Sequence, residues 1–311
     1  MTRFNSETFS SLLDTSFVGR NFEQYQVVSS TMDIARERSL AGCAHGTIVL
    51  AEEQSAGRGR QGRSFYSPDS ENLYFTVVLR LPIDAHALLS IILAVSTIQA
   101  CRAVGVGAAI KWPNDIFIED KKVAGMIVDA EIFQGDRVAL AGIGINVNGA
   151  PNEHPDLKTS AISLKQVTGL VVSREQLLAS FCNSLEKNLG ISSSILQEEY
   201  RKHSFLIGRS IRVKEKDTVY EGIAVDIAQD GGLIVQSGSA ADSGSALYHD
   251  KQDERWALAK GIAADATAVT PTSYVTTVTT ANHSPNTTSG SAGEGEMWVD
   301  TTLDEIWVRV G

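Results

Sequence analysis

The sequence predicts an α/β (α+β) fold, in which a mixed sheet with packing helices precedes a small β-barrel and an atypical low-complexity tail. Three observations support this fold class. Short β-rich runs are interspersed with helical segments as far as about residue 204. From Ile211 the pattern changes to alternating strands, which suit a small barrel. Beyond about residue 238 Ser, Thr, Ala and Gly dominate, and most of such a tail builds no core.

The expected elements follow from periodicity and turn chemistry. Ser30 is placed to cap a helix that Gly42 would stop. The turn sequences PND, DKK and QGD predict an antiparallel meander in the second half of the large domain. The predicted helices are 30–41, 84–104, 173–188 and 192–203, and the predicted strands before the barrel are 47–52, 72–81, 109–112, 116–119, 123–133 and 137–148.

Four segments are expected along the chain. A leader, 1–24, precedes the large domain, 25–204, which we expect to be catalytic. The small barrel, 205–238, has no evident last strand after Gln236. The tail, 239–311, ends in a hairpin-like pair, MWVD and EIWVRVG, which faintly resembles hairpins of phage tail proteins.

Composition limits the partners and the compartment. The net charge of −10 disfavours nucleic acid and anionic membranes unless basic residues cluster locally. No window approaches the roughly 18 apolar residues that a membrane span needs. The three widely spaced cysteines, Cys43, Cys101 and Cys182, indicate neither a disulfide framework nor a CxxC metal site. We expect reduced packing cysteines in a cytoplasmic protein that binds no DNA and no membrane.

The loop between the first two predicted strands carries the first candidate site. Arg58, Arg60 and Arg63 alternate with glycines that allow backbone N–H groups to approach an oxyanion. A solvated basic loop or an RNA tether would have the same composition. The position of the loop between two strands of an acidic chain favours an ordered site for phosphate or carboxylate.

The pentapeptide Lys111–Asp115 is the second candidate. Pro113 stiffens a turn that presents Trp112, Asn114 and Asp115 together. An indole and an amide suit a purine ring, and a carboxylate suits Mg²⁺ or ribose. A hairpin turn with a core tryptophan is the alternative.

Two further stretches add a cation and an amide. In KKVAG, Gly125 leaves room for a ligand, and either Lys121 or Lys122 could neutralise charge that passes between a carboxylate and an α-phosphate. Lysines in a hairpin turn are otherwise simply solvated. In GIGINVN, an asparagine amide could hydrogen-bond adenine, or the glycines could only relieve a crowded core strand.

Taken in order, STMD, EEQSAGRGRQGR, KWPND, KKVAGMIVD and GIGINVN closely resemble the biotin protein ligase family over about residues 25–235. The resemblance implies a class II synthetase-like ligase core followed by a small barrel. It also implies a C–N bond-forming ligase that makes biotinyl-5′-AMP from biotin and ATP, with Mg²⁺ as cofactor. The biotinyl group would then pass to a lysine of a biotin carboxyl carrier protein, of acetyl-CoA carboxylase or a similar enzyme.

The same resemblance assigns the site residues. Catalysis would rest on Lys122, Arg58 and Arg60, and Asp115 would be a Mg²⁺ ligand. The implied biotin-binding residues are Ser30, Thr31, Gln54, Arg58, Gly59, Arg60 and Lys122. The implied ATP or adenylate residues are Arg63, Trp112, Asn114, Asp115 and Asn146.

Some expectations concern departures and alternatives. Only about 24 residues precede the first motif, so we expect the monofunctional type, without an N-terminal DNA-binding domain or operator binding. A homodimer is a further expectation. A lipoate-type protein ligase shares the adenylating chemistry, and a non-catalytic binding or structural protein with a phage-like tail is the third alternative.

Overall fold

The computed structural model describes residues 3–59, 64–69, 71–81, 83–133, 136–157, 160–215, 218–228, 231–236, 245–250, 255–260, 273–274, 297–300 and 305–310. The chain divides into two compact units, Met1–Phe205 and Leu206–Gly311. Arg60 and Arg63, both predicted site residues, lie outside the described residues.

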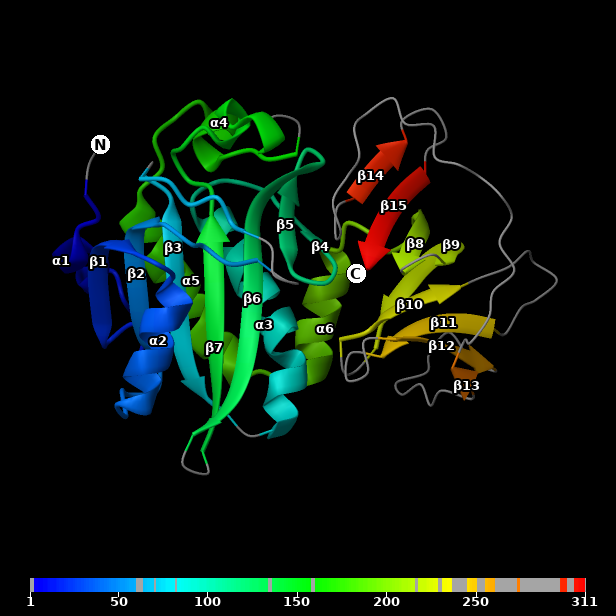
Figure 1. Cartoon of the computed structure of the whole chain (residues 1–311), viewed down its shortest axis with the longest axis horizontal. Helices are drawn as coiled ribbons and strands as arrows, with labels where there is room; N and C mark the ends of the chain where they lie inside the picture. Colours follow the sequence, from blue (N-terminus) through cyan, green and yellow to red (C-terminus); the bar gives the residue numbers. More distant parts are fainter. Residues whose placement is uncertain are drawn as a thin grey trace. The chain divides into compact units, whose positions relative to one another are not determined.

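The first unit is built on a seven-stranded mixed sheet (Figure 1). Its strands are β1 (Phe22–Val28), β2 (Thr47–Gln54), β3 (Leu73–Arg80), β4 (Ala109–Lys111), β5 (Asp115–Ile118), β6 (Lys121–Phe133) and β7 (Asp136–Ile145). Their order across the sheet is β1-β2-β3-β7-β6-β5-β4, and β1–β2 is the parallel pair among the antiparallel ones. The mixed sheet and the predicted meander are therefore confirmed.

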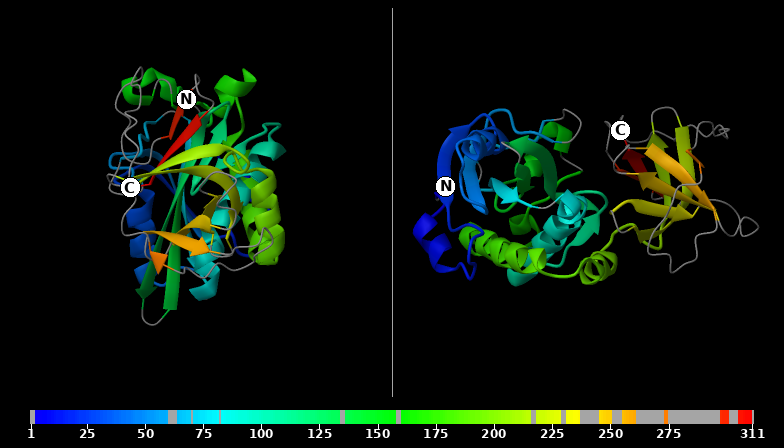
Figure 2. Two further views of the ribbon diagram at one scale, coloured as in Figure 1. Left: turned by 90° about the vertical axis from the view of Figure 1, so that its right-hand side faces the viewer. Right: turned by 90° about the horizontal axis from the view of Figure 1, so that it is seen from below.

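Helices cover both faces of this sheet. The helices of the first unit are α1 (Ser6–Ser11), α2 (Thr31–Leu40), α3 (Ile83–Ala103), α4 (Leu164–Thr168), α5 (Arg174–Leu189) and α6 (Ser193–Lys202). Short 3₁₀ turns, Pro151–Glu153 and Pro155–Leu157, follow β7. Helix α2 lies on one face, whereas α3 and α5 lie on the other (Figures 1 and 2). The face under α2 is the one that carries the candidate site.

Alternation along β3 shows how one strand serves both layers. Successive side chains of a strand point to opposite faces of the sheet. The ring of Phe75 packs edge-on against Phe181 of α5, with ring centroids 5.2 Å apart. On the opposite face, the hydroxyl of Thr76 donates to the hydroxyl of Thr31 at the start of α2, at 2.9 Å. Because both faces are covered, β3 is buried and nearly all apolar.

A buried ion pair joins β2 to α5. Glu52 and Arg174 are both only 4% exposed, and their side chains meet at 2.5 Å. Arg174 also donates to the carbonyl of Asn72, and Glu52 accepts the backbone N–H of Phe4. These bonds satisfy charges that burial would otherwise make costly.

The segment 1–24, expected as a leader, packs onto the first unit. Phe9 and Val18 are fully buried. The carboxylate of Glu186 on α5 accepts the backbone N–H groups of Ser16 and Val18, among others. Periodicity predicted neither α1 nor β1, because α1 has six residues and β1 exposes much of its length at the sheet edge.

The second unit is an eight-stranded sheet in the order β13-β12-β11-β10-β9-β8-β15-β14. Its strands are β8 (Ser210–Glu215), β9 (Thr218–Ile227), β10 (Leu233–Gln236), β11 (Ser245–Asp250), β12 (Arg255–Lys260), β13 (Ser273–Tyr274), β14 (Met297–Asp300) and β15 (Glu305–Val310). Strand β14 pairs antiparallel with β15, and β15 pairs parallel with β8.

Two features of this unit differ from expectation. Strands β11 and β12 lie in the tail, most of which was expected to build no core. Among the described strands, β13 and β14 are the two ends of the sheet and do not pair, so the predicted barrel is not closed. Alternation predicts the two faces of a sheet, but closure also requires a matching stagger between its first and last strands.

The three cysteines are free thiols, as predicted. Cys101 and Cys182 are buried, and burial raises the pKa of the Cys101 thiol to about 12. Within the described ranges, no helix combines the length and the apolar character that crossing a lipid bilayer requires.

Replacing Arg174 by Met tests the buried pair. The substitution leaves the Glu52 carboxylate buried without its cation, so the free energy of unfolding should fall by about 3–5 kcal/mol. Urea unfolding measures the change without adding salt. Lys187→Met, at an exposed position on the same helix, is the matched control and should change it by less than about 0.5 kcal/mol. Equal effects of the two variants would contradict the importance of the pair.

Candidate active site

The sheet beneath the candidate site carries two opposed glycines. In the register of the sheet, Gly125 of β6 lies opposite Gly144 of β7 on one side and Asp115 of β5 on the other. A Cβ atom at Gly125 would lie 2.8 Å from Nζ of Lys122, and one at Gly144 would lie 2.4 Å from the ring of Phe65. The two glycines therefore allow a lysine and an aromatic ring to lie directly over the sheet.

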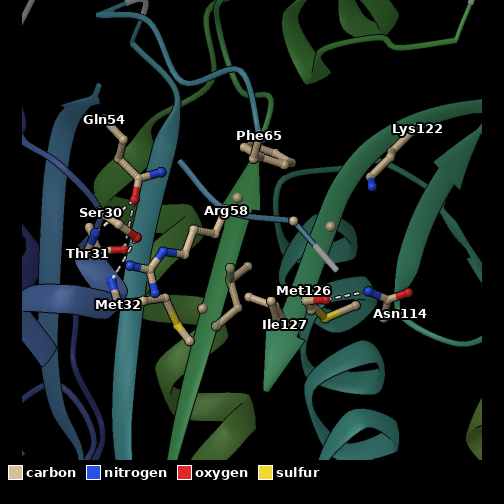
Figure 3. A pocket seen from close by; sticks show the side chains of 15 residues that line it. Ser30, Thr31, Met32, Gln54, Arg58, Phe65, Asn114, Lys122, Met126 and Ile127 are labelled. Atoms are coloured by element: carbon tan, nitrogen blue, oxygen red, sulfur yellow. Dashed lines mark hydrogen bonds between the residues drawn. The ribbon is translucent and has the colours of Figure 1, made fainter. Parts of the chain in front are cut away.

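One end of the site is a hydrogen-bonded polar group at the start of α2 (Figure 3). The side-chain carbonyl of Gln54 accepts from the backbone N–H of Thr31 at 2.9 Å and from its hydroxyl at 3.1 Å. The Gln54 amide donates to the Ser67 hydroxyl at 2.9 Å. Ser30, almost completely buried, caps α2 as predicted. These contacts hold the predicted residues Ser30, Thr31 and Gln54 together before any ligand binds.

Lys122 lies at the other end of the same depression. Its Nζ is 2.7 Å from a carboxylate oxygen of Asp115 and 5.9 Å from the centre of the Phe65 ring. The side chain is 34% exposed, so the ammonium remains accessible to a ligand. The carboxylate and the ring restrict where that ammonium can lie.

Two cavities meet at Phe65 and Lys122. The first, lined also by Ser30, Thr31 and Gln54, includes Arg58, Gly59 and Asn114 in its wall. The second has a volume of about 480 Å³ and includes Asn146, Tyr66 and His154. A ligand with two chemically different halves could therefore occupy both cavities with its linking atoms beside Lys122.

The loop between β2 and β3 is closed at its base. Arg58 and Ser64 form an antiparallel bridge, and the N–H of Phe65 donates to the carbonyl of Gly57 at 2.8 Å. A Cβ atom at Gly57 would lie 2.4 Å from the Phe65 carbonyl oxygen, so the close approach requires glycine. Arg58 itself is paired with Asp33 of α2 at 2.5 Å.

The residues predicted to bind ATP or the adenylate do not all lie in one cavity. Asn146 lines the second cavity, and its amide donates to the carbonyl of Ile162 at 3.3 Å. Asn114 lines the first cavity and donates to the carbonyl of Met126. Trp112 is 3% exposed and lines neither cavity, and Asp115 pairs with Lys122.

Asp115 offers a carboxylate of the kind that binds Mg²⁺, yet it is the partner of Lys122. In the part of the chain that the structure describes, no group of three or more His, Cys, Asp or Glu side chains converges on a metal-sized site. The described side chains therefore do not form a protein-only metal cage.

Sequence reasoning missed three aromatic residues. Phe65 separates the two cavities, and Tyr66 packs against His154 with ring centroids 4.4 Å apart. The sequence did offer a signal for Phe65 and Tyr66, because these adjacent aromatic residues follow the glycine- and arginine-rich segment closely. His154 had no local signal, because it reaches the cavity from the connection after β7.

Comparison with known proteins identifies the family. Residues 25–148 match the biotin/lipoate A/B protein ligase family, and residues 206–241 match the biotin protein ligase C terminal domain. The bifunctional ligase/repressor BirA of Bacillus subtilis is 31% identical over 243 residues, which cover 72% of each chain. The chain belongs to the biotin protein ligase family. The biotin–[acetyl-CoA-carboxylase] ligase of Mycobacterium tuberculosis is 29% identical over 71% of this chain and 86% of its own.

The fold agrees with this family. A structure of the biotin protein ligase from Aquifex aeolicus, in complex with biotin and ATP, matches with a TM-score of 0.63 and 24% identity. The match covers 78% of this chain and 99% of the Aquifex chain. The expectations of a biotin protein ligase family member and of a mixed α/β core are thus confirmed.

In this biotin ligase family member, Gly144→Ala should force the Phe65 ring away from the sheet. The overlap should lower the free energy of unfolding by about 1–3 kcal/mol, measured by guanidinium unfolding. The cost should vanish in a Phe65→Ala background, where no ring remains to be displaced. Gly107→Ala is the control, because a Cβ atom there meets nothing within 4 Å. A cost that persists without the ring would contradict the contact.

Proposed function

We propose that this chain is an ATP-dependent biotin protein ligase in which Lys122 serves both halves of the activated intermediate. It joins biotin and ATP to form biotinyl-5′-AMP and then transfers the biotinyl group to a specific lysine of a biotin carboxyl carrier protein. The observation that carries the assignment of Lys122 is its position at the boundary of the two cavities.

The side chains that line the first cavity suit the chemistry of biotin. The ureido ring of biotin presents N–H donors and a carbonyl acceptor, and the hydroxyl groups of Ser30 and Thr31 with the Gln54 amide can match them. Met126 and Ile127 add apolar wall for the thioether ring and the valeryl chain. Arg58 and Gly59, which belong to the loop between β2 and β3, also lie in the cavity wall. Biotin bound this way would direct its carboxylate toward Lys122.

The second cavity suits the nucleotide. Tyr66 and His154 offer aromatic surface beside the proline-rich wall, and Asn146 offers an amide for the edge of adenine. The α-phosphate would then lie near Lys122. Asn114 lines the first cavity and Trp112 lines neither, so we assign both to support of Asp115, which follows them in the same pentapeptide and holds Lys122.

The first chemical step joins the two substrates. A carboxylate oxygen of biotin attacks the α-phosphorus of ATP, and the bond from that phosphorus to the pyrophosphate oxygen breaks. The ammonium of Lys122 stabilises negative charge on both the carboxylate and the phosphate as the anhydride forms. Arg58 and Arg60 would cover the adenylate, and Arg63 would neutralise pyrophosphate or support the loop.

The second step transfers the biotinyl group. The ε-amine of the carrier lysine attacks the biotinyl carbonyl carbon, AMP leaves with the electrons of the broken C–O bond, and the amine loses a proton. Exclusion of water matters here, because the mixed anhydride is hydrolysed readily. The loop that carries Arg58 and Phe65 is the described element best placed to exclude it.

Mg²⁺ accompanies ATP in this proposal. The ion usually binds through one or two carboxylates together with substrate phosphates and water, so a protein-only cage is not required. Asp115 is the candidate carboxylate, and the ion would supply charge neutralisation at the phosphates. Release of Asp115 toward the ion would also free the ammonium of Lys122 for the substrate.

The carrier of acetyl-CoA carboxylase or a similar enzyme is the proposed protein substrate. We also propose that the chain forms a homodimer and that it is located in the cytoplasm. Free cysteines, two of them buried, suit a reducing compartment.

Incubation with biotin, MgATP and an apo biotin carboxyl carrier domain tests the function directly. Intact mass spectrometry should show the gain of one biotinyl group on the carrier. Lys122→Ala should lower kcat by about 10²–10³-fold, the range for loss of one donor that stabilises a transition state. Lys121→Ala, at the neighbouring position on β6, is the matched control and should retain activity.

Lipoate in place of biotin is the substrate control in the same assay. Modification by lipoate instead of biotin would contradict the biotin assignment. Equal rates for Lys122→Ala and Lys121→Ala would contradict the role of Lys122 while leaving the ligase activity in place.

A further inference from the structure

Asp33 connects α2 to Arg58, which lines the first cavity. Its carboxylate pairs with the guanidinium of Arg58 at 2.5 Å, and the two side chains are 29% and 46% exposed. Asp33 lies one turn into α2, on the helix that also presents Thr31 to Gln54. The pair therefore joins the helix at the polar end of the cavity to a loop residue in the cavity wall.

Neighbouring groups hold the Asp33 carboxylate in place. The Ser29 hydroxyl donates to its other oxygen at 3.1 Å. Arg36, one helical turn away, lies 3.6 Å from Asp33 but is closer to Glu131 and Asp129 of β6, at 2.5 Å and 3.1 Å. Because Arg36 has two other carboxylates as partners, Arg58 remains the principal counter-ion of Asp33 among the described residues.

Arg58 in turn fixes the base of the loop, which we call the loop neck (residues 54–59 and 64–67). The backbone bridge between Arg58 and Ser64 and the bond from the Phe65 N–H to the Gly57 carbonyl join the two sides of the neck into one hydrogen-bonded unit. Phe65 belongs to this unit and lies over Gly144. The ion pair between Arg58 and Asp33 of α2 therefore also helps to hold Phe65 over the junction of the two cavities.

We propose that Asp33 is a positioning residue that holds the loop neck closed through Arg58. It slows the escape of biotinyl-5′-AMP between the two chemical steps. Asp33 touches neither cavity itself and acts through Arg58. This role rests on the proposed function, because retention of an adenylate has meaning only in an enzyme that makes one.

Asp33→Asn is the direct test, since it preserves shape and removes the charge. Biotinyl-5′-AMP, formed from labelled biotin in the absence of carrier, should leave the variant at least about fivefold faster than it leaves wild type. Its release is measured by rapid gel filtration after a chase with unlabelled biotin. The rate of adenylate formation at saturating substrates should change by less than about twofold. This split between release and formation is not expected from a general loss of stability.

Three comparisons make the test specific. Asp33→Glu should retain slow release, because a carboxylate is still present. Asp129→Asn should also retain it, because Asp129 shares Arg36 but does not contact Arg58. In an Arg58→Gln background, Asp33→Asn should add no further acceleration, as expected for residues that act through one contact. Equal release by Asp33→Asn and wild type, or an equal increment in both backgrounds, would overturn the proposal.

Hydrogen exchange of the ligand-free protein tests the same contact without chemistry. Amides of the loop neck should exchange faster in Asp33→Asn than in wild type or Asp129→Asn. If wild type formed no adenylate, the proposed function would fail and the retention role with it. If wild type formed adenylate but exchange and release were unchanged in the variant, only the role of Asp33 would fail.

Discussion

The site depends on the close approach of side chains to the sheet at two opposed glycines. Gly125 and Gly144 lie opposite each other on β6 and β7, and neither has a Cβ atom. Lys122 and Phe65 occupy the space that such atoms would fill. With larger residues, the ammonium and the ring would be pushed outward, and the boundary between the two cavities would be lost. The absence of a side chain at Gly125 and Gly144 thus determines where the Lys122 ammonium lies and where it can stabilise the negative charge of a substrate.

Each described cation of the site is held by a carboxylate from a neighbouring element. Lys122 of β6 pairs with Asp115 of β5, and Arg58 of the loop pairs with Asp33 of α2. In a chain with a net charge of −10, such pairs hold positive charge locally where anionic substrates would bind. The cations are therefore oriented before a ligand arrives, which reduces the reorganisation that charge stabilisation requires.

Much of the first unit could be predicted from the sequence, because its signals are local. The cap at Ser30, the long apolar helix α3 and the turns between the meander strands all follow from short-range patterns. Ordered motifs also predicted a shared site for Thr31, Gln54 and Lys122, which line one cavity. The ligand contacts of these residues remain predictions.

The features that could not be predicted depend on contacts between distant segments. Phe65 reaches Gly144 only when the loop base closes, and His154 enters the second cavity from a separate connection. In the second unit, β15 pairs with β8 so that Ile306 lies opposite Ile211, a pairing that no local pattern encodes. Alternation alone decided neither closure of the predicted barrel nor the presence of β11, β12 and β13, whereas the terminal hairpin of β14 and β15 was predicted.

The most direct measurement is a crystal structure of the chain with a non-hydrolysable analogue of biotinyl-5′-AMP. Our prediction is that the ureido ring lies at Thr31 and Gln54, the adenine lies in the second cavity, and Nζ of Lys122 lies about 2.7–3.1 Å from the linking oxygens. An analogue bound with its linker away from Lys122, with that ammonium still bonded only to Asp115, would contradict it.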